Sequence, residues 1–266
     1  MLATATQAFE GAAHAFAHST PAVSVVIAFY VVYVYANWGR NRPALVSRRL
    51  IVGYNCVLSA TATVYSALLF ARLWNHVGRH GLWHLACAPD AITGDAGLVR
   101  LLVFHSVMRV VEFCDTIFIV HSSRPLTLLH TWHHAATLAL AHVQLIDGNP
   151  LQWLTIGLNS IVHTFMFSYY AATARGARVH PAVKRAITLM QIVQFVVLLS
   201  VYGVMLVART LGYLECYATQ RSTWAGLLVL ASYLVLFVRF ERRTYGGTVV
   251  QRPVDGAKAR TVAKAD

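Results

Sequence analysis

Seven apolar stretches, each long enough to cross a lipid bilayer, constrain this chain more than any other feature of its sequence. They lie at residues 21–38, 50–72, 98–120, 127–146, 150–172, 186–208 and 223–240. A helix rises about 1.5 Å per residue, so about 20 apolar residues cross the roughly 30 Å of hydrocarbon. Backbone polar groups need internal partners in lipid, and no strand pattern competes. The sequence therefore predicts an all-α polytopic membrane protein with seven transmembrane helices.

Composition and charge agree with a bilayer environment. Hydrophobic residues make up 57% of the chain and charged residues 12%, with a mean hydropathy of +0.55, which excludes an ordinary water-soluble domain. The net charge of +12 would point to nucleic acid in a soluble chain, but here the basic residues lie between the apolar stretches. Of the 22 Lys and Arg residues, 16 fall in alternate connections and the tail, and five on the other side. Because cytosolic loops retain positive charge, we expect a lumenal N-terminus, a cytosolic C-terminus and no nucleic-acid partner.

The domain organisation is predicted to be a single membrane domain, residues 1–266. It comprises a lumenal N-terminal segment at 1–20, a membrane region at 21–240 and a basic cytosolic tail at 241–266. No cleavable signal peptide is expected, since no basic segment and separate apolar core precede Pro21. Cys87 and Cys216 both fall in predicted lumenal loops, where the compartment permits disulfides, and we expect a bridge between them.

Polar side chains inside the predicted spans are the most informative residues for function, because they are costly in lipid and usually face the bundle interior. The predicted orientation brings those of four successive spans to one depth, near the cytosolic surface. They are Arg109, Glu112, Asp115 and Thr116, then His130, His133 and His134, then Asn159, His163, Met166, Tyr169 and Tyr170, and finally Thr188, Gln191 and Gln194. Their spacing of three or four residues gives each helix one polar stripe. A polar chamber above an apolar pocket would suit an amphiphile with a long tail, and a tightly packed bundle is the alternative.

Four sequence boxes in this region resemble the ELO fatty acid elongases. RVVEFCDT at 109–116 is similar to K-x-x-E-x-x-D-T with Arg109 in place of Lys, and LHTWHH at 129–134 contains H-x-x-H-H. NSIVHTFMFSYY at 159–170 is similar to N-x-x-x-H-x-x-M-Y-x-Y-Y with Phe167 in place of Tyr, and TLMQIVQ at 188–194 matches T-x-x-Q-x-x-Q. H-x-x-H-H alone also occurs in desaturases, whereas four boxes in this order and separation, over about residues 105–200, are specific.

The resemblance implies an acyltransferase, a very-long-chain 3-oxoacyl-CoA synthase. Such an enzyme condenses a fatty acyl-CoA with malonyl-CoA to give 3-oxoacyl-CoA, CO2 and CoA, the first step of fatty acid elongation. Soluble condensing enzymes use a Cys nucleophile, but Cys114 lies on a different stripe, so a neutral imidazole is expected to serve instead. The family boxes assign the catalytic roles. His133 is the nucleophile that forms an acyl-imidazole, His163 and Asn159 polarise or stabilise the reacting carbonyl, His130 and His134 orient the nucleophile and shuttle protons, and Glu112 and Asp115 fix the imidazole tautomers.

Binding of CoA requires cations for its phosphates at the cytosolic mouth. Lys184 and Arg239 are the residues we expect there, with Gln191, Tyr169 and Tyr170 nearer the pantetheine. No metal and no cofactor are expected, since a di-iron enzyme would use about eight histidines in several boxes. This chain has one histidine box and His163, and its other histidines are scattered along the sequence without forming a second box.

The partners implied by the resemblance are membrane lipids, acyl-CoA, malonyl-CoA, and the ketoacyl-CoA reductase, dehydratase and enoyl reductase of the elongation cycle. A homodimer and an endoplasmic reticulum membrane location also belong to this expectation. Two other functions stay open: a metal-dependent membrane lipid desaturase or hydroxylase, and a non-catalytic membrane accessory protein. A retinal protein is excluded because Lys184, Lys258 and Lys264 all lie outside the predicted spans.

Overall fold

Every element of the described chain is an α-helix, which confirms the predicted fold class. The computed structural model describes residues 2–40, 44–122, 124–213, 215–217 and 219–245, so most of the predicted basic tail lies outside the described residues. The helices are α1 (Leu2–His18), α2 (Thr20–Asn37), α3 (Arg48–Cys87), α4 (Ala96–Val111), α5 (Phe113–Val120), α6 (Leu128–Ile146), α7 (Gln152–Ala174), α8 (Pro181–Thr210) and α9 (Gln220–Tyr245).

The seven predicted stretches all coincide with helices, but one of them is interrupted. The stretch at 98–120 forms α4 and α5, which meet at Glu112. There the hydrogen bonding tightens, because the amide of Glu112 bonds the carbonyls of Met108 and Val110, and the amide of Asp115 bonds the carbonyl of Glu112.

Four helices, α2, α3, α8 and α9, are long and apolar enough by length and composition to cross a membrane, and the chain is a multi-pass membrane protein. The other three predicted spans are less apolar or shorter for a clear reason. Helix α6 carries four histidines, α7 carries the amide, hydroxyl and imidazole groups of the third box, and α4 has only 16 residues before the break. Seven spans and the orientation of the termini stay predictions.

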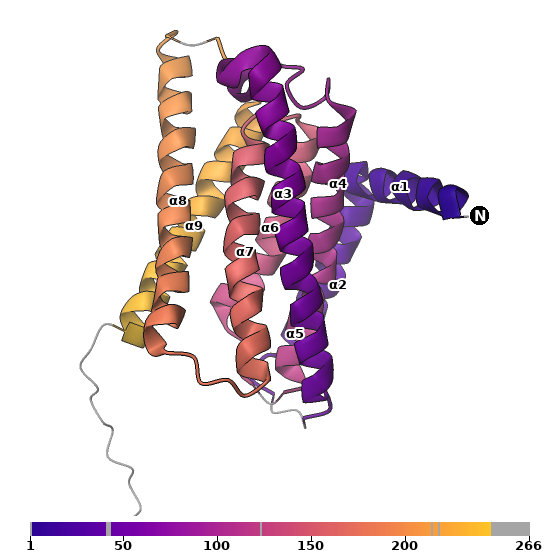
Figure 1. The fold of residues 1–266 in the computed structure, drawn as a ribbon. Helices are drawn as coiled ribbons and strands as arrows, with labels where there is room; N and C mark the ends of the chain where they lie inside the picture. Colours follow the sequence, from indigo (N-terminus) through magenta and orange to yellow (C-terminus); the bar gives the residue numbers. More distant parts are fainter. Residues whose placement is uncertain (1, 41–43, 123, 214, 218, 246–266) are drawn as a thin grey trace, which may run out of the picture.

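The arrangement in space is a bundle with one helix projecting from it. Figure 1 shows α2 to α9 running roughly side by side, while α1 extends sideways from the bundle. Helix α3 packs along α7, and α8 packs against α9. Helix α6 contacts α1, α2, α4, α5, α7 and α9. The helix that carries the histidine box therefore lies at the centre of the bundle.

Two apolar clusters hold the bundle on either side of α6. One joins α3, α4 and α7 through residues such as Leu69, Leu98 and Leu102, and the other joins α6, α8 and α9 through residues such as Leu198 and Leu230. Because lipid tails are as apolar as leucine, we expect packing contacts rather than exclusion of water to stabilise these helix pairs. Large apolar side chains on the outer faces of α2, α3, α8 and α9 are exposed, as expected for surfaces in contact with lipid.

The end of the bundle predicted to be lumenal is fixed by covalent and ionic links. Cys87 at the end of α3 and Cys216 before α9 form a disulfide, which confirms the expected pairing. Asp147, in the α6–α7 connection, accepts hydrogen bonds from Arg221 and Thr219. Burial raises the pKa of Asp147, but the hydrogen bonds from Arg221 and Thr219 outweigh burial and hold that pKa below its usual range.

Candidate active site

The histidine box begins directly at the start of a helix. The side chain of Thr127 accepts a hydrogen bond from the backbone amide of His130 at 3.3 Å and so caps α6. This cap places His130 in the first turn, with His133 and His134 in the next. The box therefore lies at the end of α6 that adjoins the α5–α6 connection.

A hydrogen-bonded chain reaches this box from another helix. The hydroxyl of Tyr30 on α2 lies 3.0 Å from the hydroxyl of Thr116, which lies 2.8 Å from Nε2 of His130. Thr116 is fully buried and Tyr30 is 6% exposed. The rings of His130 and His134 are 4.3 Å apart. These hydrogen bonds from Tyr30 through Thr116 fix the ring of His130, and that ring packs on His134.

His133 is held from the opposite side, by α9. Its ring lies 4.9 Å from that of Tyr233 and 6.4 Å from that of Phe237, and it meets His134 edge-on at 5.7 Å. The hydroxyl of Tyr233 donates to the backbone carbonyl of His133 at 3.1 Å. Tyr233 thereby fixes the turn of α6 that carries His133 without occupying its ring nitrogens.

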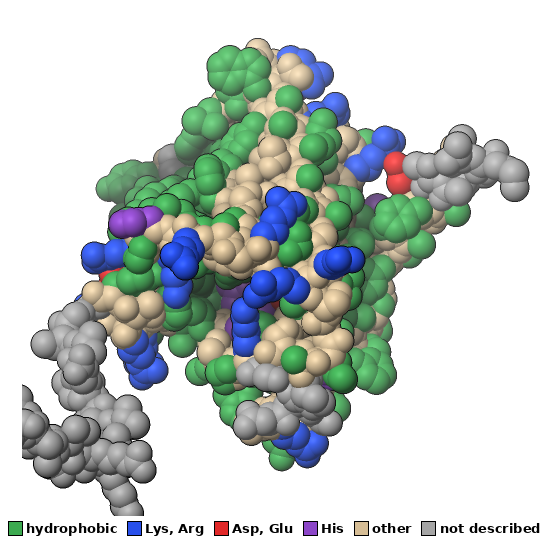
Figure 2. Space-filling model, turned by 60° about the horizontal axis from the view of Figure 1, so that its bottom comes forward, with side chains coloured by type: hydrophobic (Ala, Val, Ile, Leu, Met, Phe, Trp, Pro, Cys, Tyr) green, Lys and Arg blue, Asp and Glu red, His purple; other side chains and the backbone are tan. Residues whose placement is uncertain are grey.

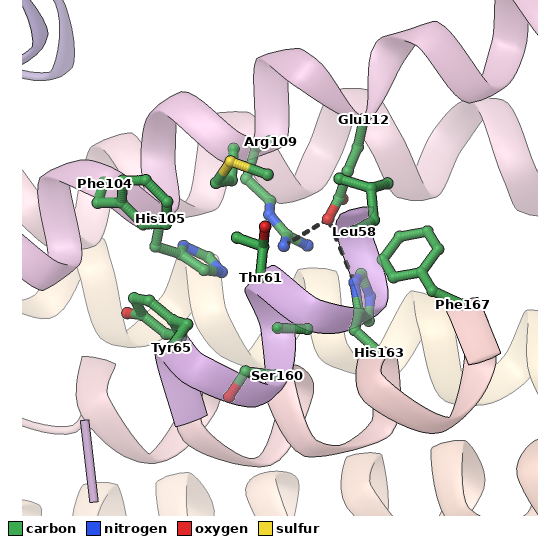
Figure 3. Close-up of a pocket in the computed structure, with 12 residues that line it drawn as sticks. Leu58, Thr61, Tyr65, Phe104, His105, Arg109, Glu112, Ser160, His163 and Phe167 are labelled. Carbon is green, nitrogen blue, oxygen red and sulfur yellow. Dashed lines mark ion pairs between the residues drawn. The ribbon is translucent and has the colours of Figure 1, made fainter. Parts of the chain in front are cut away.

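Opposite the box, α4 and α7 meet in a buried ion cluster, shown in Figure 3. Arg109 lies 2.6 Å from an oxygen of Glu112, and Nδ1 of His163 lies 3.2 Å from the same oxygen. Nη1 of Arg109 donates to Oδ1 of Asn159 at 3.2 Å. The side chains of Arg109, Glu112 and His163 are 7, 3 and 5% exposed. The structure thus brings together Glu112, His163 and Asn159, as the sequence predicted, and shows Arg109 joining them.

Asp115 occupies a different environment from Glu112. It is half-buried in the first turn of α5, close to Tyr54 on α3, whose hydroxyl donates to the backbone carbonyl of Val111 at 3.2 Å. Its predicted role in fixing an imidazole tautomer stays a prediction.

The predicted CoA-binding residues lie on neighbouring helices, α7, α8 and α9. Gln191 donates to the sulfur of Met166 at 3.8 Å, and the rings of Tyr169 and Tyr170 are 5.8 Å apart. Lys184 lies 6.0 Å from the ring of Tyr245, and both Lys184 and Arg239 are exposed.

We refer to the end of the bundle formed by the α5–α6 and α7–α8 connections and the last turn of α9 as the basic end. Figure 2 shows this end, where Lys and Arg side chains surround a hollow in which histidine and acidic side chains are visible. The polar interior is therefore open toward a ring of cations.

Two hollows adjoin the site. The α3-side hollow is a cavity of about 30 Å³ between α3, α4 and α7, and its lining includes Tyr65, His105, Arg109, Glu112 and His163. The α9-side hollow is a cavity of about 30 Å³ between α4 and α6 to α9, and its lining includes His105, His133, Gln144, Asn159 and Leu230. His133 and Gln144 are three turns apart on α6, so the α9-side hollow extends from the box toward the disulfide-linked end. The predicted pocket for a long acyl tail stays a prediction.

The family assignment follows from comparison with known proteins. A family model described as the ELO, GNS1/SUR4 family matches residues 15–252. The chain belongs to the GNS1/SUR4 (ELO) family.

Similar chains carry names that refer to fatty acid elongation. A Schizosaccharomyces pombe protein provisionally named fatty acid elongase 1 is 32% identical over 91% of this chain and 74% of its own length. Fatty acid elongase A of Dictyostelium discoideum is 35% identical over 62% of this chain and 60% of its own length. Very long chain fatty acid elongase 6 of Drosophila melanogaster is 28% identical over 85% of this chain and 72% of its own length.

Three site residues of this ELO-family chain were missed by sequence reasoning. His105 precedes Arg109 by one helical turn and lines both hollows, and its position on the polar stripe of α4 was a signal that could have identified it. Tyr30 and Tyr233 reach the box from α2 and α9, which are far away in the sequence, so no local pattern could have indicated them.

Among the described residues no group of three or more His, Cys, Asp or Glu is arranged to hold a metal ion.

Proposed function

We propose that this ELO-family chain is a fatty acid elongase that condenses a fatty acyl-CoA with malonyl-CoA to give 3-oxoacyl-CoA, CO2 and CoA. The observation that carries the proposal is that His133 lines the α9-side hollow together with Asn159, which binds Arg109 of the cluster formed with Glu112 and His163. An acyl thioester needs both a nucleophile and a group that stabilises negative charge on its carbonyl oxygen. The names of the relatives support a role in fatty acid elongation.

The first half-reaction attaches the acyl group to His133. A ring nitrogen attacks the thioester carbonyl, the bond from carbon to sulfur breaks, and the ring proton passes to the departing sulfur, which leaves as CoA. The α9-side hollow beside His133 would accept the apolar acyl chain. Packing of His133 against Tyr233 and Phe237 holds the imidazole in place for this attack.

The second half-reaction uses malonyl-CoA. Loss of CO2 leaves an electron pair on the α-carbon, and that carbon attacks the acyl carbon bound to His133. The bond from carbon to nitrogen then breaks, and the imidazole takes up one proton, so the enzyme returns to its starting state. His163 would donate a hydrogen bond to the thioester enolate oxygen from the ring nitrogen that does not face Glu112, with Asn159 beside it.

The surrounding residues would orient the imidazoles. Glu112 contacts Nδ1 of His163 and would balance the charge of an imidazolium, so that Nε2 also carries a proton and can donate to the enolate oxygen. Thr116 fixes the ring of His130, and His134 packs between His130 and His133. Asp115 would likewise fix an imidazole tautomer, as the sequence predicts.

We propose that CoA binds at the basic end. Lys184 and Arg239 would hold its phosphates there, and Gln191, Tyr169 and Tyr170 would contact the pantetheine. We further propose an endoplasmic reticulum membrane location, a cytosolic orientation of the basic end, and association with the ketoacyl-CoA reductase, dehydratase and enoyl reductase that consume the product. A homodimer is part of the same proposal.

The test is product formation by purified protein in detergent. Radiolabelled malonyl-CoA is supplied with acyl-CoAs of graded length to the wild type and to His133→Ala. We expect label in a 3-oxoacyl product for the wild type alone. His142→Gln provides a matched control, since His142 lies on the same helix, is hydrogen-bonded to Thr20 and the carbonyl of Ala17, and lies outside both hollows. Absence of product from the wild type with every acyl-CoA would refute the proposal, and so would full activity of His133→Ala.

A further inference from the structure

Two side chains on one face of α4 have buried polar atoms without a protein partner. Neither ring nitrogen of His105 has one, and Nε of Arg109 has none. Both residues are 6% exposed, and both line the α3-side hollow. Buried polar atoms are costly unless a partner satisfies them, so these three atoms indicate a ligand in this hollow.

Nδ1 of His163 also lacks a hydrogen-bond partner, but it lies 3.2 Å from the carboxylate of Glu112, and several other polar groups of this lining are satisfied. The two terminal nitrogens of Arg109 contact Glu112 and Asn159. The hydroxyl of Tyr65 donates to the carbonyl of Leu101, and that of Ser160 donates to the carbonyl of Gly157. The buried atoms of this lining with neither a hydrogen bond nor an ion-pair contact are therefore the ring nitrogens of His105 and Nε of Arg109.

The chemistry of these donors favours a carboxylate. Nε of Arg109 belongs to a cation, and charge-assisted hydrogen bonds to a carboxylate are stronger than bonds between neutral groups. His105 lies one helical turn from Arg109, and Figure 3 shows its ring extending between Tyr65 and Arg109. Two donors on adjacent turns can each bind one oxygen of the same carboxylate.

The reaction proposed above uses one substrate with a free carboxylate, and the present inference rests on that proposed function. We propose that the α3-side hollow binds the carboxylate of malonyl-CoA, with His105 and Nε of Arg109 as its hydrogen-bond donors. His105 also lines the α9-side hollow, which contains His133. A malonyl group at this junction would place its carboxylate in the α3-side hollow and its α-carbon toward the acyl group on His133.

This position also suits the bond that breaks. The bond between the α-carbon and the carboxylate carbon breaks, its electron pair stays on the α-carbon, and the negative charge moves to the thioester oxygen near His163. The product left in the α3-side hollow is neutral CO2, which suits the apolar walls formed by Leu58, Phe104 and Phe167. His105 and Nε of Arg109 would bind the carboxylate before the bond breaks. The CO2 that forms carries no charge, so it would bind these donors only weakly. No oxidant, reductant or further reactant is required.

The experiment separates the two half-reactions in full-length protein. Release of CoA from acyl-CoA alone reports acyl transfer to the enzyme, and release of CO2 from carboxyl-labelled malonyl-CoA reports the second step. The variants are His105→Leu, which removes the donors, and His105→Asn, which keeps an amide donor.

For His105→Leu we expect a KM for malonyl-CoA raised about tenfold or more and a matching fall in CO2 release, since a hydrogen bond to a charged group is lost. Acyl transfer and the chain-length profile should stay within about twofold of the wild type, and His105→Asn should recover part of the loss. Acetyl-CoA lacks the carboxylate, so its inhibition constant should be the same in the wild type and in His105→Leu.

Two results would overturn the assignment. A changed chain-length profile or slowed acyl transfer in His105→Leu would place His105 in the acyl path. Unchanged malonyl kinetics would mean that the hollow holds only water. Failure of the proposed function is distinguishable from both, because the wild type itself would then release neither CoA from acyl-CoA nor CO2 from malonyl-CoA.

Discussion

Glu112→Gln should destabilise the protein strongly, because it removes one charge from a buried pair. The substitution keeps the size of the side chain and one acceptor oxygen. It leaves the guanidinium of Arg109, which is 7% exposed and lies 2.6 Å from the present carboxylate, without a counter-charge. Breaking a buried pair in this way costs about 3–5 kcal/mol, mostly because the remaining charge is buried and uncompensated. The amide of Asn159 contacts Arg109 but carries no charge, so it cannot replace Glu112.

The double variant gives the sharper test of this reasoning. Arg109→Met combined with Glu112→Gln removes both charges, so we expect it to recover most of the stability lost in Glu112→Gln. It should stay inactive in condensation, because His163 then lacks the carboxylate that balances its charge. Thermal unfolding in detergent can be followed with a thiol-reactive dye, since Cys56 and Cys114 are free and partly buried.

Glu241→Gln is the matched control for this series. Glu241 pairs with Arg185 at 3.0 Å, but the side chain of Arg185 is 53% exposed, so the loss should be only about 0–1 kcal/mol. The reasoning would be refuted if Glu112→Gln unfolded at the same temperature as Glu241→Gln. It would also be refuted if the double variant were no more stable than Glu112→Gln.

Further predictions concern the box, the end of the α9-side hollow and the disulfide-linked end. Thr116→Val leaves Nε2 of His130 without its partner at 2.8 Å, so acyl transfer should fall about tenfold, and Thr116→Ser should restore it. Gly226→Ala would place a Cβ 2.8 Å from the ring of Tyr202, which hydrogen-bonds two side chains lining the hollow, and should move the preference toward shorter acyl chains in the graded assay. The lowered pKa of Asp147 means that its ionised form stabilises the fold above about pH 4 and that this stability is lost as the pH falls through the lowered pKa. Asp147→Asn should therefore unfold at a lower temperature than the wild type at pH 7, with the difference shrinking below pH 4, and a constant difference would contradict the assignment.

The sequence predicted the helices well because the length of an apolar stretch is a strong local signal. Residues 127–146 and 150–172 form α6 and α7 with shifts of only a few residues at their ends. The disulfide was predictable because Cys87 and Cys216 fell on the same predicted side of the membrane. The predicted orientation of the spans placed Glu112, His163 and Asn159 near one depth, and the structure joins them through Arg109.

Features that depend on a single backbone angle or on distant contacts could not be predicted from the sequence. Gly81 adopts a positive φ of 82°, so the chain bends and His84 contacts His76 at 3.1 Å, whereas the sequence left these histidines scattered. The interruption at Glu112 lies inside a stretch whose apolar pattern is continuous across it. Tyr30 contacts Thr116 across 86 residues of sequence, a separation that no helical periodicity can relate.

The measurement that tests the central claim most directly is mass spectrometry of the protein after incubation with acyl-CoA alone. With malonyl-CoA absent, the acyl group should remain on the enzyme, and we expect one acyl mass added to the peptide that contains His133, with release of an equal amount of CoA. The adduct should disappear on addition of malonyl-CoA as 3-oxoacyl-CoA forms. Condensing activity in the absence of any acyl adduct on His133 would contradict the account.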